Sequence, residues 1–259
     1  MAKTILVDIG NTNMKFGLAD HSGILQSFTL PTNREQTADS IGLDLAGMLQ
    51  HAAVDSSELE AAFACSVVPV LNPILRKACS IYLKTDLYFV PEDIKVPLEN
   101  HYAEPAQVGA DRLVGAYAAR MLYPDSVSLI CVDYGTATTF DCIQDNDYLG
   151  GLICPGLLSS SVALAARSAK LIPVSFEDIS ADGPTPGLST STSMSHGFVF
   201  GFAAMTEGLC NRLSKKLKAP CFILGTGGFA GSIARVSKCF NAVKPDLLLE
   251  GLRILYMQQ

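Results

Sequence analysis

The chain has 259 residues, of which 49% are hydrophobic and 17% charged, so it holds enough apolar material for a substantial core and shows no signature of disorder. Its net charge is -6, which argues against nucleic-acid partners, because non-specific nucleic-acid binding depends on Lys and Arg neutralising phosphates. The sequence shows no signal peptide and no apolar stretch of membrane-spanning length, so a cytoplasmic protein without membrane partners is expected.

The first half of the chain predicts three strands followed by alternating helix and strand. Apolar runs and turn residues predict strands over 4–8, 14–19 and 24–30, a helix over 37–53, a strand over 61–68, a helix over 71–82 and a strand over 86–90. A further helix is expected to begin around Asp111.

The second half repeats the opening pattern. Strands are expected over 128–133, 138–143 and 148–154, helices over 159–169 and 190–218, a strand over 222–225 and a last helix over 247–257. One unit therefore occurs twice: strand, Asp-x-Gly turn, strand, strand, helices. A repeat of this length indicates a duplicated domain. We expect domains over 1–116 and 117–259, with the option that the last helix packs back on the first domain.

Eight cysteines are present, and most lie inside apolar runs. None forms a C-x-x-C pair, so the ligand spacing argues against a zinc site. The pattern is typical of small buried hydrophobic residues in a reducing compartment.

The first Asp-x-Gly turn reads Asp-Ile-Gly-Asn-Thr-Asn-Met-Lys over residues 8–15. Gly10 lets backbone N–H groups approach an anion closely, and Lys15 adds a positive charge. A carboxylate at Asp8 beside phosphate donors makes sense mainly with a magnesium ion between them. An ordinary tight hairpin explains the same residues, so this turn alone leaves both interpretations open.

The second turn, Asp133-Tyr134-Gly135-Thr136, repeats the pattern in the other half. Two such turns can face each other across a cleft and hold a polyphosphate, so the pair is stronger evidence than either turn. A third glycine-rich segment, Gly225-Thr-Gly-Gly, lacks the Gly-Lys-Ser/Thr ending of a P-loop. A plain strand-to-helix turn explains that segment equally well.

The segment Gly109-Ala110-Asp111-Arg112 lies where a helix is predicted to begin. A carboxylate is a normal residue at a helix N-terminus, which is the simpler interpretation of Asp111. With phosphate turns elsewhere, the Asp-Arg pair also suits phosphoryl transfer. Asp111 could accept the proton of an attacking hydroxyl, and Arg112 could bind an anionic substrate.

The duplicated strand and Asp-x-Gly layout resembles the actin-like ATPase superfamily, which includes sugar kinases and actin. Within it the sequence resembles type III pantothenate kinase over nearly the whole chain. The resemblance implies an α/β fold of two ribonuclease H-like domains, each with a mixed five-stranded sheet flanked by helices, and a cleft between them. The matching motifs are Asp8-Ile-Gly-Asn-Thr-Asn, Pro105-Ala-Gln-Val-Gly-Ala-Asp-Arg, Val132-Asp-Tyr-Gly-Thr-Ala-Thr-Thr-Phe-Asp, Tyr148-Leu-Gly-Gly-Leu-Ile-Cys-Pro-Gly, Ala169-Lys-Leu, Gly225-Thr-Gly-Gly and Leu249-Glu-Gly-Leu-Arg-Ile-Leu-Tyr.

The resemblance also implies an activity and a set of roles. The activity is ATP-dependent phosphorylation of pantothenate, the first step of coenzyme A synthesis, by a homodimer. Asp111 would be the general base, and Asp133 would bind potassium or ammonium near a dimer interface. Contacts to ATP would come from Asp8, Ile9, Gly10, Asn11, Thr12, Asn13, Met14, Lys15 and Thr136, with Asp8 oriented toward magnesium. Contacts to pantothenate would come from Tyr102, Gly109, Ala110, Asp111, Arg112 and Thr190.

One region departs from the family pattern. The family usually shows Gly-x-Asn-Thr, whereas this chain has Gly187-Leu-Ser-Thr, and His196 replaces a small residue. These departures leave room for a kinase acting on another small hydroxylated acid or sugar. A non-catalytic regulator is a second alternative, against which the intact Asp8, Asp111 and Asp133 argue.

Overall fold

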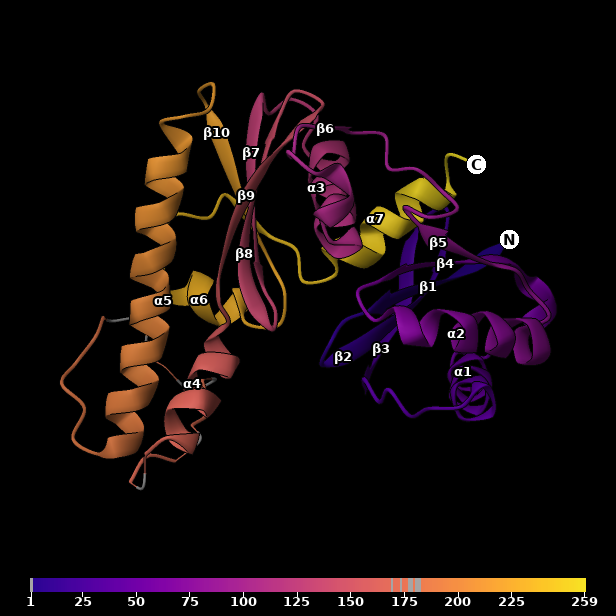
Figure 1. Ribbon diagram of the computed structural model, residues 1–259, viewed down its shortest axis with the longest axis horizontal. Helices are drawn as coiled ribbons and strands as arrows, with labels where there is room; N and C mark the ends of the chain where they lie inside the picture. Colours follow the sequence, from indigo (N-terminus) through magenta and orange to yellow (C-terminus); the bar gives the residue numbers. More distant parts are fainter. Residues whose placement is uncertain (1, 169, 173, 177–178, 180–182) are drawn as a thin grey trace. The chain divides into compact units, whose positions relative to one another are not determined.

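The computed structural model describes residues 2–168, 170–172, 174–176, 179 and 183–259. These form two compact units, seen in Figure 1 as two sheets with their own helices. The first unit comprises Met1–Leu98, Glu104–Met121 and Leu248–Gln259, and the second Glu99–Ala103 and Leu122–Leu247. The expected boundary between residues 116 and 117 falls inside helix α3 (Ala110–Leu122), which lies almost wholly in the first unit.

The first unit contains a mixed five-stranded sheet in the order β3-β2-β1-β4-β5. Its strands are β1 (Lys3–Ile9), β2 (Asn13–Asp20), β3 (Gly23–Pro31), β4 (Leu59–Ser66) and β5 (Leu87–Val90). Strand β1 pairs antiparallel with β2 and parallel with β4. The carboxyl ends of β1 and β4 therefore meet at one edge of the sheet.

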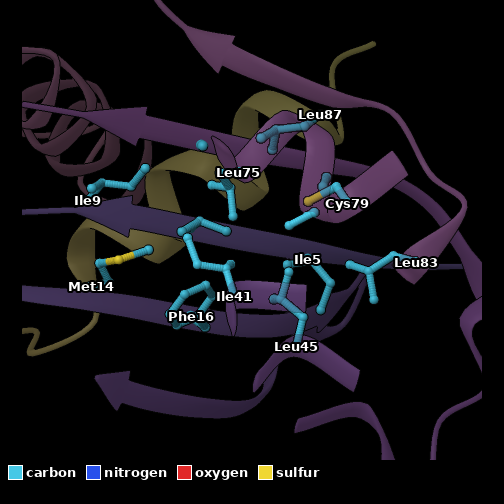
Figure 2. Close-up of a cluster of buried hydrophobic side chains, with 14 of the residues drawn as sticks. Ile5, Ile9, Met14, Phe16, Ile41, Leu45, Leu75, Cys79, Leu83 and Leu87 are labelled. Carbon is cyan, nitrogen blue, oxygen red and sulfur yellow. The ribbon is translucent and has the colours of Figure 1, made fainter. Parts of the chain in front are cut away.

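Alternation along β1 divides its side chains between two apolar layers. Ile5, Val7 and Ile9 are buried against α1 (Ala38–His51) and α2 (Asn72–Ala78), in the cluster that Figure 2 shows. Leu6 instead packs in a second cluster, with side chains of α3 and of α7 (Leu247–Tyr256). Asp8 has the same parity as Leu6, so its carboxyl group faces the α3 side of the sheet.

Local sequence explains how α1 begins. Thr37 is its N-cap, and the Thr37 hydroxyl accepts a hydrogen bond from the Ser40 N–H at 3.2 Å. Buried Ile41, Leu45 and Leu49 recur every four residues and point at the sheet. The helix expected over 71–82 is divided, because α2 is followed by a π-helical turn at Cys79–Leu83.

The second unit contains a mixed six-stranded sheet in the order β11-β10-β7-β8-β9-β6. Its strands are β6 (Glu99–Asn100), β7 (Ser128–Tyr134), β8 (Ala137–Gln144), β9 (Asp147–Pro155), β10 (Cys221–Thr226) and β11 (Ala242–Val243). This sheet has one strand more than expected, because the two-residue β6 pairs parallel with the outer edge of β9. Without β6, its order repeats that of the first sheet, so the predicted duplication is confirmed.

Three helices cover one face of the second sheet: α4 (Leu157–Ala166), α5 (Thr190–Ser214) and α6 (Ala230–Val236). They bury Ile130, Val132 and Tyr134 of β7, whereas Asp133 has the opposite parity. The predicted motif residue Ala169 lies outside the described residues. Within the part of the chain that is described, no helix has the length and apolar character needed to cross a membrane.

Candidate functional site

The carboxylate of Asp8 lies at the carboxyl end of β1, beside residues of two neighbouring strands. In the sheet register Asp8 stands opposite Lys15 of β2 and Cys65 of β4. The Cys65 thiol donates a hydrogen bond to Asp8 Oδ1 at 3.6 Å. The strand pairing therefore brings a carboxylate, an ammonium group and a buried thiol to one edge.

The β1–β2 connection is a tight turn that the segment after β3 braces. The Gly10 N–H donates to the Asn13 carbonyl at 3.0 Å, as in an ordinary hairpin. The Thr32 hydroxyl donates to the Gly10 carbonyl at 2.6 Å, and Arg34 Nη2 donates to Asn11 Oδ1 at 3.1 Å. The turn therefore has the hydrogen bonding of an ordinary hairpin. This does not exclude anion binding, because Thr32 and Arg34 brace the turn and Arg34 adds a second positive charge to that of Lys15.

Asp111 occupies the first turn of α3, where its position is closely constrained. The Arg112 N–H donates to Asp111 Oδ1 at 2.8 Å. A Cβ atom on Gly109 would stand only 2.4 Å from the same oxygen, so the carboxylate fills the space that the glycine leaves. Burial raises the pKa of Asp111 above its ordinary value, while the Arg112 amide and guanidinium oppose the shift.

Asp8 and Asp111 influence each other electrostatically. Burial raises the pKa of Asp8 to about 7, and the charge of Asp111 contributes to the same shift. The Cys65 hydrogen bond and the Lys15 charge act in the opposite direction on that pKa. Two carboxyl groups from motifs far apart in the sequence therefore share one partly buried site, where their negative charges repel.

Sequence reasoning missed Cys65, Thr32 and Arg34. Cys65 carried no signal, because a cysteine in an apolar strand is typical of a core residue. Thr32 and Arg34 follow directly after the third predicted strand, where polar residues are expected in any loop. The sheet order is what links Thr32 and Arg34 to the site, because they follow β3, which lies two strands from β1 in the same sheet.

In the second unit, the other two glycine-containing turns lie against each other. Asp133 of β7 stands opposite Thr226 of β10 in the sheet register. Gly227 has a φ of +87°, and a Cβ atom there would lie 2.2 Å from Asp133 Oδ1. The third glycine-rich segment therefore forms a cradle for the Asp133 carboxylate, and glycine is required for both its backbone conformation and the close approach.

Thr136 is held through its main chain. Its carbonyl accepts a hydrogen bond from the Ser159 hydroxyl at 2.7 Å. A Cβ atom on Gly156 would lie 2.1 Å from the same carbonyl oxygen, so the chain passes very close to the turn before α4 begins.

The segment that departs from the family pattern begins α5. Ser189 is the N-cap, its hydroxyl accepts from the Thr192 N–H at 3.2 Å, and the Thr192 hydroxyl accepts from the Ser189 N–H at 3.1 Å. Ser and Asn are both strong N-cap residues, so the departure from Asn at Ser189 leaves the start of α5 capped. His196 Nδ1 lies 3.0 Å from the Thr185 carbonyl, which ties the helix to the loop before it.

The residues expected to contact pantothenate divide between the two units. Those of the first unit lie together at the start of α3, and they are Gly109, Ala110, Asp111 and Arg112. Tyr102 and Thr190 belong to the second unit. The Tyr102 ring there packs against Gly150, where a Cβ atom would lie 3.2 Å from it. A substrate site shared by these residues stays a prediction.

The carboxylates of Asp8 and Asp111 are the candidates for a metal ion at this site. Among the residues described, no group of three or more His, Cys, Asp or Glu side chains could hold a metal. Magnesium is nevertheless commonly bound by one or two carboxylates together with substrate phosphates, so the Asp8 and Asp111 pair fits that mode.

Comparison with known proteins gives consistent results. A family model described as type III pantothenate kinase matches residues 4–212. The chain is 58% identical over 254 residues to a type III pantothenate kinase of Oleidesulfovibrio alaskensis, covering 98% of this chain and 96% of that one. It is 56% identical to a protein of the same description from Nitratidesulfovibrio vulgaris, covering 98% and 97%.

Among solved structures, the polyphosphate/ATP-glucomannokinase of an Arthrobacter species matches with a TM-score of 0.50 and 15% identity, covering 100% of both chains. At this identity the likeness concerns the fold alone.

Proposed function

The chain belongs to the type III pantothenate kinase family, and on this basis we propose how its own residues transfer a phosphoryl group from ATP to pantothenate. Phosphorylation of pantothenate in coenzyme A biosynthesis is the activity of the family. The proposal assigns a role in that reaction to each side chain of the site. The observation that carries it is the pair of partly buried carboxylates formed by Asp8 and Asp111.

Asp111 is the general base. Its Oδ1 accepts the Arg112 amide, so Oδ2 is the oxygen that takes the proton from the attacking primary hydroxyl. Burial raises the pKa of this carboxyl group, which makes it a stronger base than a solvated aspartate. The Arg112 guanidinium and the Gly109 and Ala110 backbone position the pantothenate carboxylate and amide groups.

The turn over residues 10–13 holds the ATP phosphates. The Gly10 N–H already donates to the Asn13 carbonyl, so the backbone N–H groups that approach the phosphate oxygens are those after Gly10, and Asn11, Thr12 and Asn13 add side-chain donors. Lys15 and Arg34 flank the turn with positive charge, which offsets the charge that develops on the phosphate oxygens.

Asp8 faces the magnesium ion that accompanies ATP. Its pKa of about 7 reflects burial and the nearby Asp111 charge, so a divalent cation at this edge would stabilise the ionised form of both groups. Bound magnesium supplies charge neutralisation to the transferring phosphate.

Asp133 binds a monovalent cation, potassium or ammonium, in the second unit. Its carboxylate is an oxygen ligand of the type such cations prefer, and the Gly227 cradle leaves its Oδ1 in a defined position. Thr136 contacts ATP from the same turn, and Tyr102 and Thr190 contact pantothenate.

The enzyme acts as a homodimer, and an apolar surface on the second unit supports this assembly. On α4, Leu158 and Val162 lie one helical turn apart on the same side of the helix, and they are 44% and 50% exposed. Large apolar side chains grouped on one short helix are typical of a surface that another chain covers. Light scattering of the purified protein tests this, with Val162→Glu expected to give monomers if α4 forms the interface.

The assignment of Asp111 is tested by Asp111→Asn, which keeps the oxygen that accepts the Arg112 amide but removes the base. We expect normal folding and a loss of about 10²–10⁴-fold in kcat, measured by ADP release with pantothenate. Asp44→Asn, at an exposed carboxylate of α1, is the matched control and should retain full activity. Full activity of Asp111→Asn would exclude Asp111 as the base.

A further inference from the structure

A cavity of about 600 Å³ lies within the first unit, on the side of the sheet that α7 covers. Every described residue that lines it belongs to that unit. Small-molecule sites typically have volumes of about 300–1,000 Å³, so this cavity is large enough for a ligand of ordinary size.

The cavity lies at the opposite end of the strands from the phosphate turn. Glu60 and Ala61 are part of its wall, and Ala61 stands opposite Thr4 near the start of β1. Cys65, which bonds to Asp8, is five residues further along β4 than Glu60, or about 16 Å at about 3.3 Å per residue. A ligand in the cavity is therefore not expected to contact Asp8.

Three aromatic rings form much of the wall. The centroid of the Phe63 ring lies 5.6 Å from that of Tyr88 and 5.6 Å from that of Tyr256. Phe63 is only 2% exposed, whereas Tyr88 is 38% exposed and can offer its ring to a ligand. Because the face of an aromatic ring carries negative electrostatic potential, this wall attracts cations as well as apolar groups.

The Glu60 carboxylate adds a negative charge to the wall. Tyr256 Oη donates a hydrogen bond to Glu60 Oε2, which in the described chain is the one hydrogen bond of this carboxylate. Burial raises the pKa of Tyr256 to about 12, and the Glu60 bond adds to the shift, so the phenol keeps its proton and Glu60 remains the acceptor. Glu60 Oε1 is therefore available to a ligand, and the described wall contains no Lys or Arg that would neutralise it.

Contacts of α7 hold the Tyr256 side of the cavity in place. Arg253 Nη1 donates to the His21 carbonyl at 3.2 Å, which ties α7 to the turn between β2 and β3. Leu255 is only 1% exposed and packs in the same apolar cluster as Phe63. The wall is therefore largely formed before any ligand binds, which lowers the ordering cost of binding.

We propose that this cavity binds a small organic cation, an amine with a flat apolar body, at a site separate from those of ATP and pantothenate. The ammonium group pairs with Glu60 Oε1, and the apolar body packs against the Tyr88 ring. A carboxylate of the same shape binds less well, because Glu60 repels it.

Tryptamine is a suitable probe, and indole-3-propionate has the same ring with the opposite charge. Because the chain contains no tryptophan, the anisotropy of indole fluorescence reports the probe alone during titration with the protein. Tryptamine should bind, and indole-3-propionate should bind at least about tenfold more weakly. The Kd of tryptamine should not change at saturating ATP and pantothenate.

Two variants locate the site. Glu60→Gln keeps an oxygen for the Tyr256 hydroxyl but removes the charge, so the Kd of tryptamine should rise about tenfold. Tyr88→Ala removes the exposed ring and should raise it about two- to fivefold. Glu92→Gln, at an exposed carboxylate that is not part of the wall, is the matched control and should leave Kd unchanged.

Absence of tryptamine binding to the wild-type protein at millimolar concentration would overturn the proposal, and this result depends on no variant. Displacement of tryptamine by ATP or pantothenate would also overturn it, by placing the probe in the catalytic site. Equal or stronger binding of indole-3-propionate would point to His21, another wall residue, and would reject the cation preference. An unchanged Kd in Glu60→Gln, with thermal melting showing that the variant is folded, would reject Glu60 as the partner of the ammonium group.

Discussion

Replacing Gly109 with alanine tests whether the placement of the Asp111 carboxylate controls turnover. The new Cβ atom would lie 2.4 Å from Asp111 Oδ1, whereas an ordinary van der Waals contact begins at 3.4 Å. The carboxylate must therefore retreat by about 1 Å, the difference between these two distances. Because the clashing atom is the end of a side chain, it can move without disturbing the core.

The two expected effects differ in size. A misplacement of about 1 Å in a reacting group typically costs about 10²-fold in rate, or about 2.7 kcal/mol of transition-state stabilisation. Gly109 precedes the first residue of α3, and its carbonyl accepts the Leu113 N–H at 3.2 Å, so it acts as the N-cap. Alanine is a poorer N-cap than glycine, which should lower the free energy of unfolding by only about 1 kcal/mol.

The assay measures kcat by ADP release at saturating ATP and pantothenate, alongside thermal unfolding. Gly115→Ala, within the same helix, is the matched control because no atom lies within 4 Å of the added Cβ. It should keep wild-type turnover and gain about 0.5–1 kcal/mol in stability, since alanine is favoured over glycine inside a helix. Wild-type kcat in folded Gly109→Ala would refute the reasoning, because the base would then tolerate displacement.

Three further predictions concern charges at the two turns. Asp8→Asn should abolish turnover yet stabilise the ligand-free protein at pH 8 by up to about 4 kcal/mol. The Asp8 carboxyl group has a pKa of about 7 in the folded protein and 3.8 in the unfolded chain, so the free energy of unfolding of the wild type falls as pH rises through that interval. Urea titrations at pH 5 and pH 8 should therefore show a larger gain in stability for Asp8→Asn at pH 8. Asp133→Asn should remove activation by potassium or ammonium while leaving the melting temperature near that of the wild type; activation that persists would reject Asp133 as the cation ligand. Arg34→Ala removes the bond to Asn11 and a positive charge at the phosphate turn, so KM for ATP should rise several-fold with KM for pantothenate unchanged; an unchanged KM for ATP would show that Arg34 is an ordinary surface residue.

Most elements and both aspartate turns were predictable because their signals are local. The apolar run of β1 ends at a turn of small polar residues, and the same pattern recurs at Asp133, so strand, turn and duplication can be inferred from residues close together in the chain. The two-residue strands β6 and β11 escaped prediction. Each exists only through its pairing with a distant strand, and two residues carry no periodic pattern.

Electrostatics at the site depended wholly on the tertiary structure. Asp8 and Asp111 each admit a simpler interpretation in sequence, as a hairpin residue and a helix N-terminal residue. Because side chains alternate along β1, Asp8 faces α3, and burial there strengthens the repulsion between the Asp8 and Asp111 charges. No pattern of neighbouring residues in the sequence predicts this interaction.

Residues with the chemistry for phosphoryl transfer were thus identifiable from the chain alone, since side-chain type and turn conformation are local properties. The folded molecule was needed to show which of them meet, how the Gly109 and Gly227 positions shape the two carboxylates, and that Cys65 and Arg34 have polar partners. Desolvation and Coulomb interaction depend on distances between groups far apart in the chain, and folding alone sets those distances.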